Sequence, residues 1–221
     1  MAARVVDLSH TIRNGMRAYP GIPAPAIDAF LTHEQSRARY QGQCELTFSR
    51  VSIVAGVGTY LDSPYHRQAG LPDHATLALD RLVDLPTVVV DITHRSGRAI
   101  DSDLLGSDLP QAGALLLRSG MDADWETDRY WTDGPFLTAA AADRLVAARI
   151  AVLGADFLNV DNTGDPRRPV HTGLLRAGIP IIENLRGLGA LPRTGARLHV
   201  ASIPLEGVAS FPIRAYAMLP P

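Results

Sequence analysis

The sequence contains no lysine, because all 21 of its basic residues are arginine. Schiff-base catalysis, a pyridoxal-phosphate anchor and the phosphate-binding loop of nucleotide hydrolases all need a lysine amine, so these mechanisms are excluded. The arginines are scattered, and with 23 acidic residues the formal net charge is -2. No stripe of positive charge indicates a nucleic-acid surface. We therefore expect a small-molecule partner and no nucleic acid.

Cysteine is nearly absent as well. Cys44 is the only one in the chain, which excludes an intrachain disulfide and a zinc cluster held by thiolates. Any metal ion would need histidine, aspartate or glutamate ligands. A lone cysteine can act as a nucleophile, but it is more often a small hydrophobic residue of the interior. We expect Cys44 to be buried.

Long hydrophobic runs are missing too. The segment from Met1 to Leu8 has no apolar core long enough for a signal peptide, and no later run approaches the length of a membrane span. We expect a cytoplasmic protein that does not bind membranes. The 221 residues include 46% hydrophobic residues and no segment that resembles a linker, which predicts one domain over residues 1–221.

Short apolar runs separated by turn residues predict an α/β fold with more strand than helix. The alanine-rich segment 138–149 has leucine and valine at helical spacing and predicts the clearest helix. A short helix is predicted over residues 172–177, followed by a strand over 179–182 that presents Glu183 at its end. The proline-rich segment 16–23 cannot be a helix. Further strands are predicted over residues 4–9, 46–54, 85–92, 113–118, 150–153, 197–204 and 208–217.

A polar pair follows a glycine-rich turn in the first third of the chain, in the stretch Asp62-Ser63-Pro64-Tyr65-His66. Pro64 lacks a helical donor and pushes Ser63 towards an extended conformation, so Asp62 and His66 cannot share a helix face. We expect both on a loop that the strand over 46–54 delivers to a sheet edge, where active sites are common. Alternatively, Asp62 only caps the turn through its own backbone.

A second polar pair, His171 and Glu183, lies far downstream in otherwise apolar sequence. A buried charge at Glu183 is costly unless it is paired. Together with Asp62 and His66, these groups suit general acid-base chemistry or one divalent ion, and we predict that all four meet in one cleft. The other histidines lack comparable partners and are expected to be structural; they are His10, His33, His74, His94 and His199.

These motifs resemble the cyclase family that includes bacterial kynurenine formamidase and isatin hydrolase. The resemblance covers almost the whole chain, through residues 7–12, 19–21, 58–66, 171–175 and 182–185. It implies a swivelling β/β/α domain with a mixed sheet. It also implies a homo-oligomer, a dimer or tetramer, in which neighbouring subunits often complete the pocket.

The sequence departs from the family at one motif. In the family it reads H-x-G-T-H-x-D-x-P-x-H, and its two leading histidines and its aspartate hold a divalent metal that activates water. Gly56 and Tyr60 stand at those histidine positions here. We therefore expect the first metal to be lost, and we favour metal-free chemistry with no cofactor. The alternative is one zinc or manganese ion at the remaining family positions, which are Asp62, His66, His171 and Glu183.

The leading functional hypothesis is a cyclase or lyase of small-molecule biosynthesis, for example of polyketides or other natural products. In it, His66, supported by Asp62 or Glu183, moves a proton on a carbonyl-bearing substrate. Tyr60 donates a hydrogen bond to the developing oxyanion. The first alternative is a metal-dependent hydrolase of an amide, lactam or lactone. The second is a non-catalytic binding protein that retains the family pocket.

Overall fold

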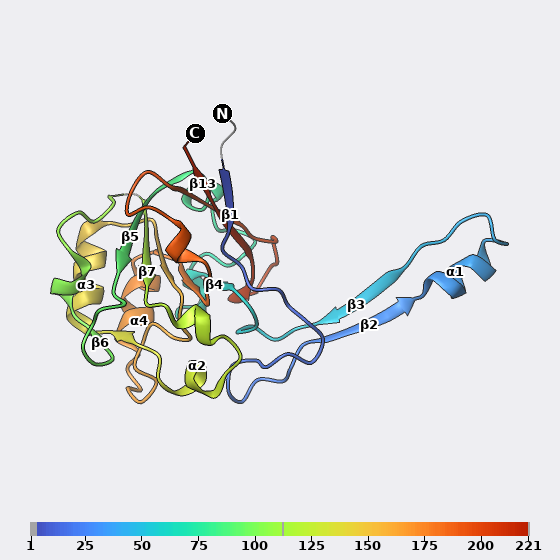
Figure 1. Cartoon of the computed structure of the whole chain (residues 1–221), viewed down its shortest axis with the longest axis horizontal. Coiled ribbons are helices and arrows are strands. Elements are labelled where there is room, and N and C mark those ends of the chain that lie inside the picture. The colour runs from blue at the N-terminus through green and yellow to red at the C-terminus, as the bar shows by residue number, and fades with distance from the viewer. Residues whose placement is uncertain (1–3, 112, 221) are drawn as a thin grey trace.

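The computed structural model describes residues 4–111 and 113–220, and within them a curled sheet of nine strands forms the centre of the molecule (Figure 1). The strand order is β1-β13-β11-β5-β7-β9-β10-β4-β12. The strands are β1 (Arg4–Asp7), β4 (Tyr60–Asp62), β5 (Leu85–Asp91), β7 (Ala114–Arg118), β9 (Val152–Ala155), β10 (Ile181–Glu183), β11 (Arg197–Ala201), β12 (Ser210–Pro212) and β13 (Arg214–Leu219). Strands β5, β7, β9 and β10 are parallel, and the others pair antiparallel. The mixed sheet, with more strand than helix, confirms the predicted fold class.

The two faces of the sheet carry separate hydrophobic cores. Side chains alternate along a strand, so Leu116 of β7 faces one core while Leu115 and Leu117 face the other. The sheet curls enough that Ser9, just after β1, forms a bridge with Leu185, just after β10. The inner face of the curl is therefore closed by the sheet itself, and the outer face needs helices to cover it.

Two helices, α3 (Ala139–Ala148) and α4 (Pro169–Arg176), pack against that outer face. Helix α3 begins after Thr138, whose hydroxyl accepts the backbone N–H of Ala141 at 3.2 Å, and it ends at the left-handed Arg149. The segment predicted as the clearest helix is thus confirmed. Helix α4 begins three residues before the predicted one, because proline is favoured at the first helical position. His171 consequently belongs to α4.

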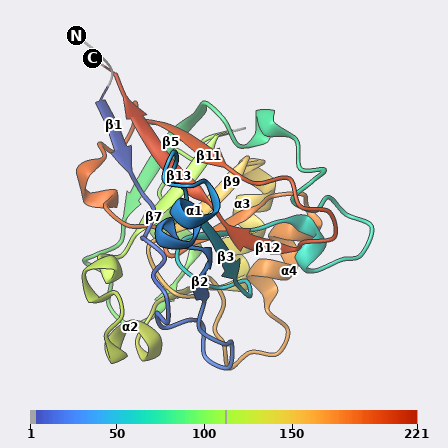
Figure 2. The same ribbon diagram turned by 90° about the vertical axis from the view of Figure 1, so that its right-hand side faces the viewer.

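A long arm projects from the body of the molecule (Figure 1) and points towards the viewer in Figure 2. It consists of β2 (Ala26–Leu31) and β3 (Phe48–Ser52), which pair with each other, and α1 (His33–Arg39) between them. The strand predicted over residues 46–54 lies here and does not lead into the central sheet. All residues of β3 are exposed, and so is Cys44, which corrects the expectation of a buried cysteine. The arm has no core of its own in which to bury them.

The C-terminal segment also differs from its prediction. Residues 208–217 belong to two strands, β12 and β13, at different places in the sheet. The chain changes partner between Ile213, whose N–H donates to the carbonyl of Thr59 at 3.0 Å, and Arg214, which pairs with Ala201 of β11. The smaller elements are β6 (Ala99–Ile100), β8 (Phe136–Leu137), α2 (Asp128–Thr132) and the 3-10 turns Pro64–His66, Leu79–Arg81, Ser102–Leu105, Met121–Asp124 and Leu188–Ala190. Among the described residues, no helix combines the length and apolar character needed to cross a membrane.

Candidate active site

Strands β4 and β10 place three polar side chains side by side. They pair antiparallel, with Tyr60 opposite Glu183 and Asp62 opposite Ile181. Because side chains alternate, Tyr60 and Asp62 share the face of the sheet that α4 covers. Asp62 thus ends a strand that is hydrogen-bonded on both sides, by β10 and β12, and does not lie on a loop as predicted. His66 lies in the 3-10 turn that follows.

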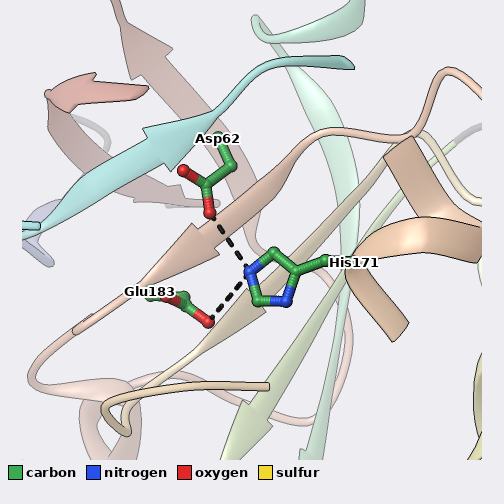
Figure 3. Close-up of side chains that lie close together, drawn as sticks. All are labelled: Asp62, His171 and Glu183. Carbon is green, nitrogen blue, oxygen red and sulfur yellow. Dashed lines mark ion pairs between the residues drawn. The ribbon is translucent and has the colours of Figure 1, made fainter. Parts of the chain in front are cut away.

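His171 reaches this face from the first turn of α4 (Figure 3). Its Nε2 atom lies 3.3 Å from Asp62 Oδ2 and 3.5 Å from Glu183 Oε1. On the other side of the ring, Nδ1 lies 2.7 Å from Asp161 Oδ2. Asp161 also accepts the backbone N–H groups of Val170 and His171, at 2.8 and 3.0 Å. It therefore fixes both the start of the helix and the orientation of the imidazole.

The side chains of Asp62, His171 and Glu183 fit a divalent ion. Their candidate ligand atoms all lie within 4.8 Å of one another, and the three residues are buried. Tetrahedral zinc with bonds of about 2.0–2.1 Å separates its ligand atoms by about 3.3 Å, close to the 3.3 and 3.5 Å found around His171 Nε2. Asp161 supplies the second hydrogen bond that metal-binding histidines nearly always make.

The electrostatics of the site also favour a cation. Burial disfavours a charged His171, but its hydrogen bonds to Asp161 and Asp62, together with the charge of Glu183, raise its pKa to about 10. Burial raises the pKa of Glu183 to about 7. Several carboxylates thus surround one imidazole, and they favour positive charge at Nε2. Either a proton or a cation can supply that charge.

Tyr60 is hydrogen-bonded to Glu183. Its hydroxyl donates a hydrogen bond to Glu183 Oε2, while the backbone N–H of Val160 donates to Oε1 at 2.8 Å. Burial, and next the charge of Glu183, raise the pKa of Tyr60 well above its usual value, so the phenol keeps its proton. The geometry makes Tyr60 an orienting partner of Glu183. Its role as donor to an oxyanion stays a prediction.

His66 is connected to Asp62 through Ser210. The Ser210 hydroxyl donates to Asp62 Oδ1, and its oxygen lies 3.2 Å from His66 Nδ1. Because the hydroxyl proton is directed at Asp62, the oxygen can only accept from Nδ1–H of His66. This leaves Nε2 of His66 with a free lone pair. Burial lowers the pKa of His66, so the ring is neutral at pH 7.

These groups lie around one cavity of about 410 Å³. All five site residues named from the sequence line it, namely Tyr60, Asp62, His66, His171 and Glu183. The predicted meeting of the two polar pairs is therefore found. His66 does not join the metal-ligand group, and its ring centroid is 5.9 Å from that of His171. The cavity is completed by residues including Tyr19, Ile22, Arg67, Asn159, Arg168 and Ser210.

Two residues of the site had escaped the sequence interpretation. Asp161 lies in a stretch rich in asparagine, aspartate and glycine that indicates only a turn, and its spacing of ten residues from His171 is the one available signal. Ser210 has no signal in the sequence. Two other histidines have structural contacts: His74 lies 3.0 Å from the carbonyl oxygen of Leu61, and His10 stacks on Trp125.

Curated relatives share much of this chain. Kynurenine formamidase of Bacillus cytotoxicus is 24% identical over 83% of both chains. Isatin hydrolase of Roseibium aggregatum is 30% identical over 74% of this chain and 71% of its own length. Among solved structures, an isatin hydrolase bound to the product analogue thioisatinate has a TM-score of 0.84 and 22% identity, over 99% of this chain and 93% of that chain.

A further solved structure bears on the metal. A protein described as a potential metal-dependent hydrolase with cyclase activity has a TM-score of 0.76 and is 25% identical over 100% of both chains. This similarity, and the buried group of Asp62, His171 and Glu183, overturn the expectation of a site without a cofactor. That expectation was wrong because it weighed the histidines missing at Gly56 and Tyr60 above the ligands contributed by α4 and β10.

A sequence model of one protein family matches most of the chain. The Cyclase model, described as "Putative cyclase", matches residues 6–162. The matched segment includes the whole stretch from Asp62 to His66, and the relatives above extend the similarity beyond it. On this basis the chain belongs to the cyclase family and is an enzyme of cyclase or hydrolase type.

Proposed function

We propose that this enzyme hydrolyses an amide, lactam or lactone bond in a small carbonyl compound, with one divalent ion held by Asp62, His171 and Glu183. The observation that carries the proposal is the position of these three ligands on a cavity of about 410 Å³ that is also lined by His66. A divalent ion held there supplies Lewis-acid chemistry towards a carbonyl oxygen.

His66 is the proposed proton carrier. Its neutral ring has a free Nε2 lone pair, because Ser210 engages Nδ1. The imidazole accepts a proton as the water oxygen adds to the substrate carbonyl, and returns it to the nitrogen or oxygen that leaves when the bond breaks. Ser210 in turn is held by Asp62. The same carboxylate thereby links the proposed base to the proposed cation site.

The biosynthetic, ring-closing reaction inferred from the sequence remains a hypothesis. Hydrolysis of a lactam or lactone and closure of the same ring are one reaction in opposite directions, so both use the same proton carrier. The family resemblance supports either direction. Incubating the metal-loaded enzyme with the ring-opened acid, and measuring whether the cyclic compound forms, tests the reverse direction.

Direct hydrolysis assays test the main proposal. Protein loaded with zinc or manganese would be given an aryl formamide, an aryl-fused lactam and an aryl-fused lactone, each with and without prior treatment with a chelator. We expect turnover of at least one compound that is lost on chelation and restored by the metal. His66→Gln should lower turnover by about 100-fold or more. His94→Gln, an exposed change outside both the cavity and the arm, is the control.

Turnover that persists undiminished after complete metal removal would refute the proposed role of the ion. Equal activity of the His66→Gln and His94→Gln variants would remove His66 from the mechanism.

We also propose that the enzyme is a homo-oligomer assembled through the arm of β2, α1 and β3. The arm exposes Phe30, Phe48 and Val51, with 66%, 57% and 56% of their surface accessible. An isolated two-stranded hairpin is marginally stable in water, and a partner subunit would stabilise it. Light scattering of the wild type and of Phe30→Asp tests this, and a monomeric wild type would refute it. The cytoplasmic location stays a prediction.

A further inference from the structure

Two arginines line the cavity of the candidate active site. They are Arg67, which follows the 3-10 turn of His66, and Arg168, which precedes helix α4. In the part of the chain that the structure describes, neither guanidinium has a carboxylate oxygen within 4.0 Å. Both positive charges therefore lack an acidic partner from the protein where they border the cavity.

The backbone separates Arg168 from its neighbour Arg167. Arg168 adopts a left-handed conformation with φ of 46°, which non-glycine residues seldom do. It lines the cavity, and its Nη1 atom lies 3.4 Å from Asn159 Oδ1. Arg167 is not among the lining residues, and its guanidinium pairs with Asp165 at 2.8 and 3.0 Å. Of the two adjacent arginines, the one without an acidic partner borders the cavity.

The charge balance of the cavity favours an anionic ligand. One divalent ion at His171 would offset the charges of Asp62 and Glu183. Arg67 and Arg168 then add positive charge that no cavity-lining group neutralises. A guanidinium binds a carboxylate through two parallel hydrogen bonds, which makes arginine well suited to recognise that group.

We propose that the substrate of this enzyme carries a carboxylate, which Arg168 binds with support from Arg67. The reacting carbonyl of the substrate then faces His66 and the proposed metal ligands. The inference rests on the proposed function, because it assigns the substrate class of the same cavity. Arg168 is then a specificity-determining residue. It selects acidic amides, lactams or lactones over neutral ones.

Binding measurements test this without requiring turnover. Calorimetry on zinc-loaded protein would compare anthranilate with 2-aminobenzamide, which has the same size but no charge. We expect the wild type to bind anthranilate about tenfold more tightly. Arg168→Met should abolish this preference, Arg67→Met should reduce it, and Arg168→Lys should restore part of it. Arg167→Met, the matched control, should retain it in full.

The proposal is overturned if anthranilate binds the wild type no more tightly than the amide, including the case in which neither binds. It is equally overturned if Arg168→Met keeps the full preference, since the carboxylate would then be held at the metal. A protein that shows the predicted preference but hydrolyses nothing would refute the proposed function and leave the carboxylate site intact.

Discussion

Asp161 holds the imidazole of His171 from the side opposite to Asp62 and Glu183, with 2.7 Å between its Oδ2 atom and Nδ1 of the ring. This contact directs Nε2 into the gap between the two carboxylates, where the ion is proposed to bind. The candidate metal site thus depends on a residue outside the ligand group.

Asp161→Asn should weaken zinc binding by about 10-fold to 100-fold, because it keeps the shape of the side chain but removes the charge that orients the imidazole. Competition with a chromophoric chelator measures the affinity. Asp165→Asn changes a carboxylate of the same loop that pairs with Arg167, and it should leave zinc binding unchanged. Equal affinities of the wild type and Asp161→Asn would contradict this account.

Tyr60→Phe separates two roles of the tyrosine. If the hydroxyl orients Glu183, its loss should weaken zinc binding by about tenfold and cost about 1–3 kcal/mol of stability, because a buried carboxylate oxygen loses its donor. If the hydroxyl instead stabilises an oxyanion, turnover should fall by about 100-fold with zinc affinity unchanged. Chelator competition and steady-state kinetics distinguish the two. Tyr65→Phe, at an exposed tyrosine, is the control.

The stability of the protein should respond to pH through Asp156. This buried carboxyl accepts hydrogen bonds from Ser119 and Gly120, but burial outweighs them and raises its pKa from 3.8 to about 6. Between these values the folded protein keeps a proton that the unfolded chain has released. The contribution of Asp156 to the free energy of unfolding therefore falls as pH rises from 4 to 6.

Asp156→Asn should remove this dependence. Between pH 4.5 and 6.5, the stability of the wild type relative to the variant should decrease by about 2 kcal/mol, measured by urea unfolding. For Asp143→Asn, on the exposed side of α3, the free energy of unfolding should change with pH in parallel with that of the wild type. If the difference in the free energy of unfolding between the wild type and Asp156→Asn stays constant over this range, the pKa of Asp156 is not raised in the folded protein.

Gly154 is required by close packing. A Cβ atom at this position of β9 would approach Leu116 Cδ2 to 2.6 Å and Leu185 Cδ1 to 2.7 Å. Gly154→Ala should therefore cost about 1–3 kcal/mol. Gly173→Ala in α4 meets nothing within 4 Å and should stabilise the protein by about 0.5–1 kcal/mol, since alanine favours helix. Thermal unfolding of both variants checks the opposite signs, and equal effects would refute the packing argument.

The sequence predicted those features that depend on local pattern. The alanine-rich segment formed α3, and Glu183 was identified because an acidic residue stands among apolar ones at a strand end. The strand predicted over residues 46–54 formed as β3, but its projection from the body in an arm was not predicted, since exposed strands carry no burial pattern. The metal ligands were misjudged for a different reason. The missing histidines at Gly56 and Tyr60 are visible in one motif. The distances of 3.3 and 3.5 Å from His171 Nε2 to the two carboxylates, which suit a metal ion, depend on long-range packing that a linear pattern does not record.

The pairing of β4 with β10 ties the chemistry of this enzyme to the correctness of its folding. Leu61 and Ile182 face each other across the two strands and are fully buried in the inner core. A slip of one residue in the register would turn Leu61 towards the cavity and drive Tyr60 and Asp62 into the apolar interior. The cost of burying these polar groups thereby disfavours the misregistered fold before a cation can bind. The amount of zinc bound per chain during refolding should consequently measure the fraction of chains with the native register.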